Sequence, residues 1–254
     1  MNAAGNEPDS PARGSFPTTQ WSLVLNADSP DSAEVRDALE ALCRRYWYPI
    51  YVFVRRHGYA HYEAEDCTQE FLARLIATGA VTRARPERGR FRAFLATSLR
   101  HFLVNRWHKA TTAKRGGNVA IESLDWSGAE NRFAREPIDA GLTPEQAFDR
   151  AWTLEMIDWA KRDLGDEYRR TGRAAIFEAL APLLFQDAAV DSIANAAATL
   201  QLSPHAVTTA VHRLRRRLGE RLRMHVAETV GSAADVDDEL RALIAICGLP
   251  TPVA

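Results

Sequence analysis

The sequence predicts an all-α protein, with two helical domains joined by a flexible linker. Apolar residues recur every three to four positions along most of the 254-residue chain, and almost no segment alternates as a strand does. Hydrophobic residues make up 46% of the sequence, which is enough to fill real cores in a chain of this length. Glycine and proline separate the periodic stretches, so the boundaries of the helices can be placed.

The first part of the chain is predicted to be a helical bundle. Residues 1–17 are polar and rich in Pro, Gly and Ser, so we expect a disordered N-terminus, and the bundle occupies 18–115. Its first helix contains Pro49, which is expected to kink it, and a second helix is expected over 62–77. A third helix is expected over 91–112.

A linker and a second helical domain follow. Residues 116–142 lack periodicity and mix Gly, Ser, Asp and Pro, as flexible linkers do. Thr143 and Pro144 are the residue types of a helix N-cap and of a first helical position, so a second domain is expected over 143–230. Residues 231–254 are predicted to be a tail that contains one short helix.

Two turns are expected within the second domain. Gly165 and Gly172 are expected to bracket the first. Residues 192–224 predict two helices around a tight second turn, and Ser203 has the residue type of the N-cap of the later helix. Gln201 stands where such a turn usually has glycine, so its backbone must tolerate a left-handed or distorted conformation.

Charge is concentrated in two basic segments. The formal net charge of the whole chain is −1, yet residues 83–115 contain ten Lys and Arg against one acidic residue. Residues 204–223 contain six Arg and one Glu, so the rest of the chain is strongly acidic. Two basic segments in an acidic body indicate two contacts with a polyanion.

Several classes of protein are disfavoured by the sequence. The three cysteines, Cys43, Cys67 and Cys247, are far apart and form no CxxC pair, which argues against a disulfide framework or a zinc site and suits a reducing cytosol. No secretory signal is visible, and the apolar runs are too short to span a bilayer. No nucleophile with a positioned base and no phosphate loop is present, so we expect no catalytic residue, no cofactor and no enzymatic activity.

The second of the two helices predicted within 192–224 has the pattern of a recognition helix, which enters the major groove of DNA. Val207, Val211, Leu214 and Leu218 recur at helical spacing and are expected to point inward. His205 and Thr209 lie near its N-terminal end, where residues that read bases normally sit, whereas Arg213, Arg215, Arg216 and Arg217 suit phosphates. The alternative is a solvated basic helix packed on a bundle.

Aromatic and cationic residues alternate over 91–115. Trp107 falls among Asn105, Arg106, His108 and Lys109, a mixture that suits an unstacked nucleic-acid strand, because cations follow phosphates and a ring offers a stacking surface. The alternative is that the aromatics are core residues. We favour this alternative for a subset of three aromatics, whereas for Trp107 both interpretations stay open. That subset is Phe91, Phe94 and Phe102.

An acidic cluster lies upstream of the aromatic segment. Its members are Glu63, Glu65, Asp66 and Glu70. Carboxylates at this spacing could hold a metal ion, but the pattern fits no metal-ligand motif, so no metal site is expected. An acidic helix face of this kind is usually solvated or binds a partner.

Three segments together resemble bacterial RNA polymerase sigma factors of the sigma-70 family, in the extracytoplasmic function (ECF) group. AEDCTQEFLARLI (64–76) is similar to the helix that grips the clamp helices of the β′ subunit, and FRAFLATSLRHFLVNRW (91–107) to the helix that melts and reads the −10 element. Residues 192–224 are similar to region 4, which reads the −35 element and touches the β flap. The phrases YWYPIYVFVRRHGY and VDDELRALIA resemble the planctomycete-type ECF groups.

The resemblance assigns roles to individual residues. The residues that would bind core polymerase are Asp66, Gln69, Glu70 and Phe71, with Phe71 seating the helix on its own core. Those that would bind DNA through region 2 are Arg92, Arg100, Asn105, Arg106, Trp107 and Lys109. Those that would bind DNA through region 4 are His205, Thr208, Thr209, His212, Arg213 and Arg216. The implied partners are core RNA polymerase and promoter DNA, with room for an anti-sigma factor, in a bacterial cytoplasm at the nucleoid.

Two other functions compete with a sigma factor. A helix-turn-helix transcriptional regulator with an N-terminal sensing domain would explain 192–224 but not the other two segments. A metal-dependent nuclease would need a general base and a set of metal ligands that the sequence does not show. Co-purification with core polymerase separates these possibilities, because a regulator would bind duplex DNA alone and a nuclease would cut DNA when Mg²⁺ is added.

Overall fold

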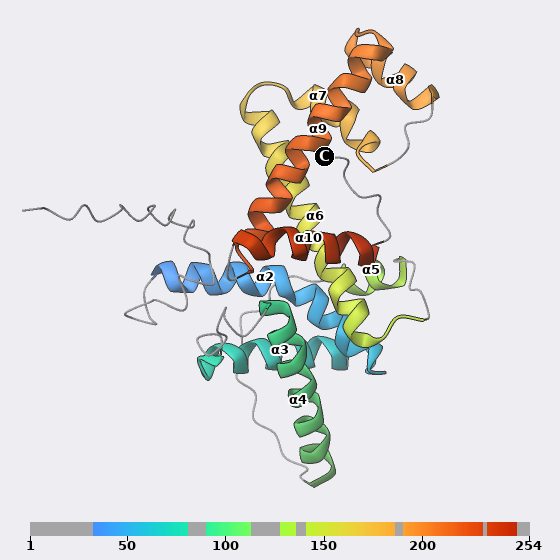
Figure 1. The fold of residues 1–254 in the computed structure, drawn as a ribbon. Coiled ribbons are helices and arrows are strands. Elements are labelled where there is room, and N and C mark those ends of the chain that lie inside the picture. The colour runs from blue at the N-terminus through green and yellow to red at the C-terminus, as the bar shows by residue number, and fades with distance from the viewer. Residues whose placement is uncertain are drawn as a thin grey trace, which may run out of the picture.

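The computed structural model describes residues 33–80, 90–112, 128–135, 141–185, 190–230 and 233–247. The described residues form helices and contain no strand, which confirms the all-α prediction (Figure 1). In chain order the α-helices are α2 (Ala33–Arg56), α3 (His61–Ala77), α4 (Phe91–Thr112), α5 (Ala129–Arg135), α6 (Pro144–Arg170), α7 (Ala174–Leu180), α8 (Val190–Leu200), α9 (Pro204–Ala227) and α10 (Ala233–Cys247), and the short 3₁₀ helix η3 (Ala181–Leu183) follows α7.

Local signals at the starts of α6 and α9 act as predicted. Thr143 Oγ1 accepts a hydrogen bond from the backbone N–H of Gln146, and the Gln146 side chain accepts one from the Thr143 N–H, so a complete capping box opens α6. Ser203 Oγ accepts from the N–H of Ala206 at 3.2 Å and caps α9. Proline occupies an early helical position in both helices, where its missing N–H costs nothing.

Helix α2 continues through Pro49 and forms the centre of the first core. The residues on either side of Pro49 are almost fully buried, among them Trp47, Ile50, Tyr51 and Phe53. A proline inside a helix costs ~3 kcal/mol, but burying several large apolar side chains stabilises the helix by more than that. Tertiary packing therefore holds the helix together at this position.

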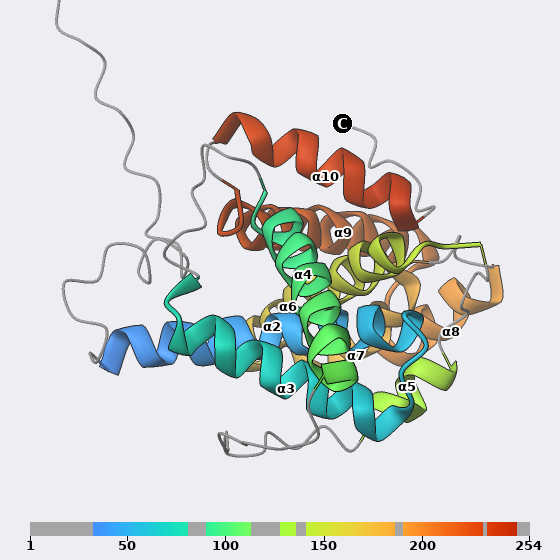
Figure 2. The same ribbon diagram turned by 90° about the horizontal axis from the view of Figure 1, so that it is seen from below.

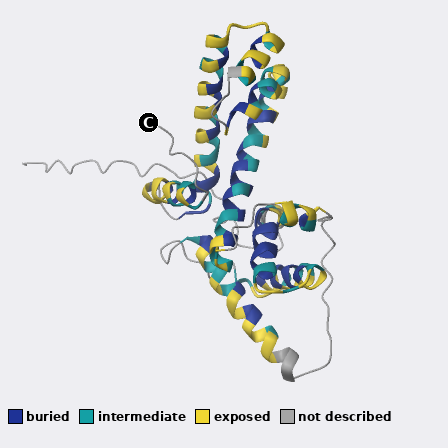
Figure 3. Cartoon of the chain, turned by 90° about the vertical axis from the view of Figure 1, so that its right-hand side faces the viewer, coloured by how far each residue is buried: buried dark blue, intermediate teal, exposed yellow. Residues whose placement is uncertain are grey.

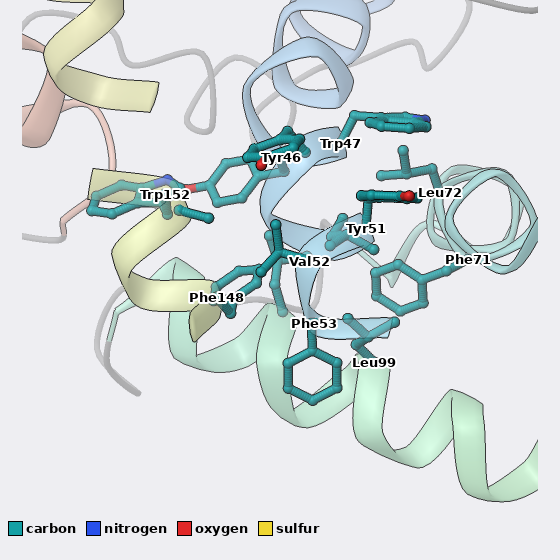
Figure 4. Packing of buried hydrophobic residues seen from close by; sticks show 14 of the residues in the cluster. Tyr46, Trp47, Tyr51, Val52, Phe53, Phe71, Leu72, Leu99, Phe148 and Trp152 are labelled. Atoms are coloured by element: carbon teal, nitrogen blue, oxygen red, sulfur yellow. The ribbon is translucent and has the colours of Figure 1, made fainter. Parts of the chain in front are cut away.

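The first hydrophobic cluster joins α2 to α3, α4, α5 and the first half of α6. Figure 4 shows the rings at its centre. Tyr46 of α2 stacks against Trp152 of α6 with ring centroids 6.2 Å apart, and Phe53 meets Phe148 edge-to-face at 6.3 Å. Val226 of α9 and residues of α10 complete this cluster. The start of α6 is therefore an integral part of the N-terminal bundle.

The second cluster lies between the second half of α6 and helices α7, α8 and α9. Gly165 lies inside α6, so the prediction that a turn begins at Gly165 is wrong. A Cβ atom at Gly165 would come within 2.9 Å of Phe177 Cε1, so glycine is present because the α7 side chain packs directly on the α6 backbone. Gly172, with φ +70°, does lie at the turn that follows α6.

Helices α6 and α9 are long enough to take part in both clusters. Phe148 and Trp152 lie in the first and Leu164 in the second, while Leu222 of α9 packs against both. Figure 3 shows the two helices running side by side from one end of the molecule toward the middle. Because α6 and α9 contribute side chains to both clusters, these two helices connect the clusters directly.

Part of the segment predicted as a linker is a helix. Helix α5 lies within 116–142 and is fixed by ion pairs of Arg132 to Glu155 and of Glu130 to Arg55. The rest of that segment, apart from residues 128 and 141–142, lies outside the described residues, as do the predicted disordered residues 1–17.

Candidate nucleic-acid interface

The C-terminal half of α4 projects from the bundle (Figures 1 and 3). Its inner face is anchored by buried side chains, namely Leu95, Leu99, Phe102 and Leu103. Phe91 is buried and Phe94 is half-buried, so these aromatics and Phe102 are core residues, as we favoured. Trp107 differs from them, because 61% of its side chain is exposed.

A stripe of exposed residues follows the outer face of α4. Arg100 and Trp107 are exposed at one edge of this stripe and Asn105 at the other, whereas the half-buried Arg106 lies on the side that faces α3. Val104, 49% exposed, and His101 belong to the same stripe although the sequence analysis did not select them. Their spacing of three and four from the selected residues was the available signal. The side chain of Lys109 lies outside the described residues.

Carboxylates of neighbouring helices hold two of the α4 cations. Arg100 is ion-paired with Glu145 of α6 at 2.5 Å, and this hydrogen bond is the main reason that the pKa of Glu145 is lowered. Arg106 is ion-paired with Glu70 of α3. Both pairs are largely exposed, so phosphates can compete for these guanidinium groups at little cost.

Arg92 occupies a different environment from the other predicted α4 residues. Only 7% of it is exposed, and its guanidinium is bound to Asp149 of α6 and Glu239 of α10. Burial opposes its charge, but the hydrogen bonds to Glu239 and Asp149 outweigh burial and raise the pKa above its usual value. Arg92 is therefore buried and paired in this structure, contrary to its prediction as an exposed DNA contact.

The acidic face predicted on α3 is present at the surface. Asp66 and Glu70 are exposed and Gln69 is half-buried. Phe71 is buried, and its ring lies 5.5 Å from that of Phe102, so it supports α3 from within and does not reach a partner directly. Thr68 is also buried and donates to the Ala64 carbonyl at 2.7 Å.

Three of the four carboxylates of this region, Glu63, Glu65 and Glu70, have partners within the protein. Glu63 accepts a hydrogen bond from the Ala60 N–H at the start of α3, and Glu65 lies 3.8 Å from His61. Among the described residues no group of His, Cys, Asp and Glu side chains is arranged to hold a metal ion. The described helices also include none that is long and apolar enough to cross a bilayer.

Helices α8 and α9 are joined by the three residues 201–203. Gln201 has φ +54°, the left-handed conformation predicted for it, and the N–H of Leu202 donates to the Ala197 carbonyl at 3.0 Å. The apolar residues predicted to face inward from α9 are buried, namely Val207, Val211, Leu214 and Leu218. The pair is therefore a compact two-helix unit with one free face on α9.

The free face of α9 carries the predicted region 4 residues. The exposed members are His205, Thr208, His212, Arg213 and Arg216, and Thr209 is half-exposed. The hydroxyls of Thr208 and Thr209 donate to carbonyls one turn earlier, on Pro204 and His205, so each oxygen keeps lone pairs that can accept a further hydrogen bond.

Two arginines of α9 are used internally, contrary to our assignment of them to phosphates. Arg215 donates from Nε and an Nη atom to the carbonyls of Leu184 and Leu183, at 3.0 and 2.8 Å, which fixes the end of η3. Arg217 is ion-paired with Glu167 and lies over the Tyr168 ring. These two residues flank the inner face of α9, whereas Arg213 and Arg216 lie on the outer face.

Helices α2, α3 and α4 correspond to a known domain. Residues 35–112 match the family model described as Sigma-70 region 2. No curated protein and no solved structure matches the chain. The match covers less than a third of the sequence and supports a sigma-70 family sigma factor, with a role in promoter recognition and transcription initiation.

Proposed function

We propose that this chain is an ECF-type sigma factor of the planctomycete type. It binds core RNA polymerase and directs it to promoters, with α2–α4 recognising the −10 element and α8–α9 the −35 element. The observation that carries the proposal is the Sigma-70 region 2 match over the three helices that present the exposed aromatic and basic stripe of α4.

The stripe of α4 suits a melted strand. An exposed tryptophan offers a stacking surface to an unpaired base, and Arg100, Asn105 and Arg106 offer donors to its backbone. Opening a duplex in this way needs no covalent bond to be made or broken. It needs tighter binding to the opened strand than to the duplex, with unstacked bases held against the protein.

The outer face of α9 suits the major groove of duplex DNA. A capped helix of 24 residues presents His205, Thr208 and Thr209 near its N-terminal end, where they can read base edges. Arg213 and Arg216, two to three turns further on, can bind phosphates and fix the register of the helix.

The acidic face of α3 suits core polymerase. Asp66, Gln69 and Glu70 would accept hydrogen bonds from basic and amide groups of the β′ clamp helices, with Phe71 holding α3 in place from inside. An acidic docking face also keeps the polymerase contact separate from the basic DNA contacts. The β flap contact of α8–α9, an anti-sigma partner and a cytoplasmic, nucleoid-associated location belong to the same proposal.

Transcription in vitro tests the proposal directly. The full chain is combined with purified core polymerase and fragmented genomic DNA of the organism that encodes it, and the start sites are mapped. We expect starts that share upstream sequence at −10 and −35 and that are absent with core alone. A chain that binds duplex DNA without core, and does not co-purify with core, would instead be a transcriptional regulator.

A pair of variants links these starts to α4. Trp107→Ala should retain binding to core and lose most specific initiation, because the stacking surface is removed. Met224→Ala is the matched control, since its side chain is a similarly exposed apolar group, 57% exposed, on a distant part of α9. Equal initiation by the two variants would contradict the role given to Trp107.

A further inference from the structure

The last described helix, α10, is attached to the basic start of α4 through one buried carboxylate. Glu239 is 1% exposed, and its Oε1 accepts from Arg92 Nε at 2.5 Å. Its Oε2 lies 2.7 Å from Arg90 Nε. Arg92 is also bound to Asp149 of α6, so charges alternate along the chain Arg90, Glu239, Arg92 and Asp149 across three helices.

Helix α10 also packs against α6 and α9, but it buries few side chains. Among its described side chains only Val236, Glu239 and Leu243 are buried, whereas α6 buries twelve residues. Figure 2 shows α10 beside α9, at the side of the bundle where α4 begins. On that side Asp237 is ion-paired with Arg223 of α9 at the surface. A helix with so little apolar burial separates from the bundle more easily than the helices beneath it.

The groups that hold α10 are the ones that a nucleic acid would compete for. A carboxylate and a phosphate offer the same acceptor oxygens to a guanidinium group. Arg90 and Arg92 follow directly on the sequence 83–88, which contains three further arginines, so they belong to the larger of the two basic segments. A strand that approaches this segment can replace the Glu239 carboxylate as the partner of both arginines.

We propose that α10 is an intramolecular latch: Glu239 occupies Arg90 and Arg92 in the free protein, and binding of a single-stranded polyanion to α4 displaces the helix. The inference rests on the proposed binding of nucleic acid by α4. In the latched state Arg90 and Arg92 are withdrawn from nucleic acid, and these pairs bind the start of α4 to α10 through Glu239 and to α6 through Asp149. In the released state Arg90 is exposed, whereas Arg92 has lost Glu239 and keeps Asp149 of α6 as its partner.

The first test compares two variants of the full chain that change net charge equally. Glu239→Gln removes the carboxylate of the latch, and Asp238→Asn removes a neighbouring exposed carboxylate that is paired with Arg241 within α10. Binding of a fluorescent, mixed-sequence single-stranded DNA is measured by anisotropy at several salt concentrations. Freeing Arg90 should steepen the slope of log K against log salt by about 0.7, the contribution of one contact with a single strand. The change rises to about 1.4 when the strand also replaces Asp149 as the partner of Arg92.

Several outcomes decide the proposal. A steeper slope and tighter binding for Glu239→Gln alone, both cancelled when Arg90→Ala and Arg92→Ala are added, support it. Identical slopes for Glu239→Gln and Asp238→Asn overturn it. Thermal unfolding shows whether each variant is folded at the assay temperature.

A second measurement needs no variant. Hydrogen exchange of the wild-type chain is followed with and without the same single-stranded DNA. The proposal requires the amides of α10 to lose protection when DNA is bound, and unchanged protection with DNA bound overturns it. Failure of the latch and failure of the sigma assignment are distinguishable, because neither measurement contains polymerase and the transcription assay does not depend on Glu239.

Discussion

The carboxylate of Glu70 on α3 is ion-paired with the guanidinium of Arg106 on α4. Glu70 belongs to the face proposed to bind core polymerase, and Arg106 is one of the residues proposed to hold the melted strand. If core polymerase takes Glu70 as an acceptor, as the proposed function requires, Arg106 would lose its partner and become free to bind DNA. The pair thus couples the two proposed contacts within the first helical bundle.

We expect Glu70→Ala to weaken binding to core polymerase while strengthening binding of single-stranded DNA to the free protein. An exposed ion pair with a partner contributes ~1 kcal/mol, so the loss of core affinity should be about five-fold. The freed Arg106 should add about 0.7 to the salt slope of DNA binding. A pull-down with core and fluorescence anisotropy with the oligonucleotide measure the two effects.

Asp66→Ala is the matched control for this prediction. Asp66 lies one turn earlier on the exposed face of α3. It should weaken core binding without changing the salt slope, and the double variant with Glu70→Ala should leave duplex binding by α9 intact. A double variant that binds core as tightly as wild type does would remove the clamp role from α3.

We expect Arg213→Ala to weaken binding of duplex DNA and to flatten its salt dependence by about 0.9, because one phosphate contact is lost. Arg215→Ala changes the same residue type two positions away, but Arg215 binds the carbonyls of Leu183 and Leu184. Arg215→Ala should therefore lower the free energy of unfolding and leave the salt slope unchanged. The reverse pattern would show that the two arginines have been assigned to the wrong sides of α9.

We expect Gly165→Ala to destabilise the protein even though alanine is the better helix former. The new Cβ would lie 2.9 Å from Phe177 Cε1, and such overpacking costs ~1–3 kcal/mol, against a gain of ~1 kcal/mol in helix propensity. Urea denaturation measures the net loss.

Gly219→Ala on α9 serves as the control, because nothing lies within 4 Å of its added Cβ. That variant should gain up to ~1 kcal/mol. Phe177→Leu should relieve the contact at Gly165, so adding Gly165→Ala in that background should no longer destabilise the chain. A loss that persists without the ring would mean that another neighbour restricts position 165.

The stability of the chain should fall in acid partly through Glu167. Hydrogen bonds from Arg221 and then Arg217 lower the pKa of Glu167 below its usual value of 4.5. Because the pKa is lowered in the folded state, the stabilisation is complete above pH 4.5 and is lost as the pH falls through the folded value. Glu167→Gln should flatten the dependence of unfolding on pH below 4.5, as measured by urea midpoints.

Glu220→Gln controls for the loss of a carboxylate on the outer surface of α9. Glu220 is exposed and lies 3.6 Å from Arg216, away from the contact between α6 and α9. If the two variants respond alike to acid, the Glu167 pairs do not contribute to the acid sensitivity.

Local chemistry made much of the fold predictable. The caps at Thr143 and Ser203 depend on residues three positions away, and the left-handed backbone of Gln201 follows from the length of its turn. The inward apolar residues of α9 follow from helical spacing alone. In each case the determinants lie within a few turns of the residue concerned.

Long-range contacts explain what the sequence did not predict. In the sequence Arg92 is one more cation of a basic segment, and its buried place depends on Glu239, which lies 147 positions further along the chain. Gly165 has the residue type of a turn, and only the ring of Phe177 on the next helix explains its place inside α6. Spacing within one segment carries no information about such partners.

Helix α6 also bears on how modular this architecture is. The recognised domain ends at residue 112, yet Trp152 and Phe148 fill the space beside Tyr46 and Phe53. A gene fusion that borrowed only the first three helices would leave those rings facing water. Exchange of this domain between proteins therefore has to carry the first three turns of α6, which include Phe148 and Trp152, with it.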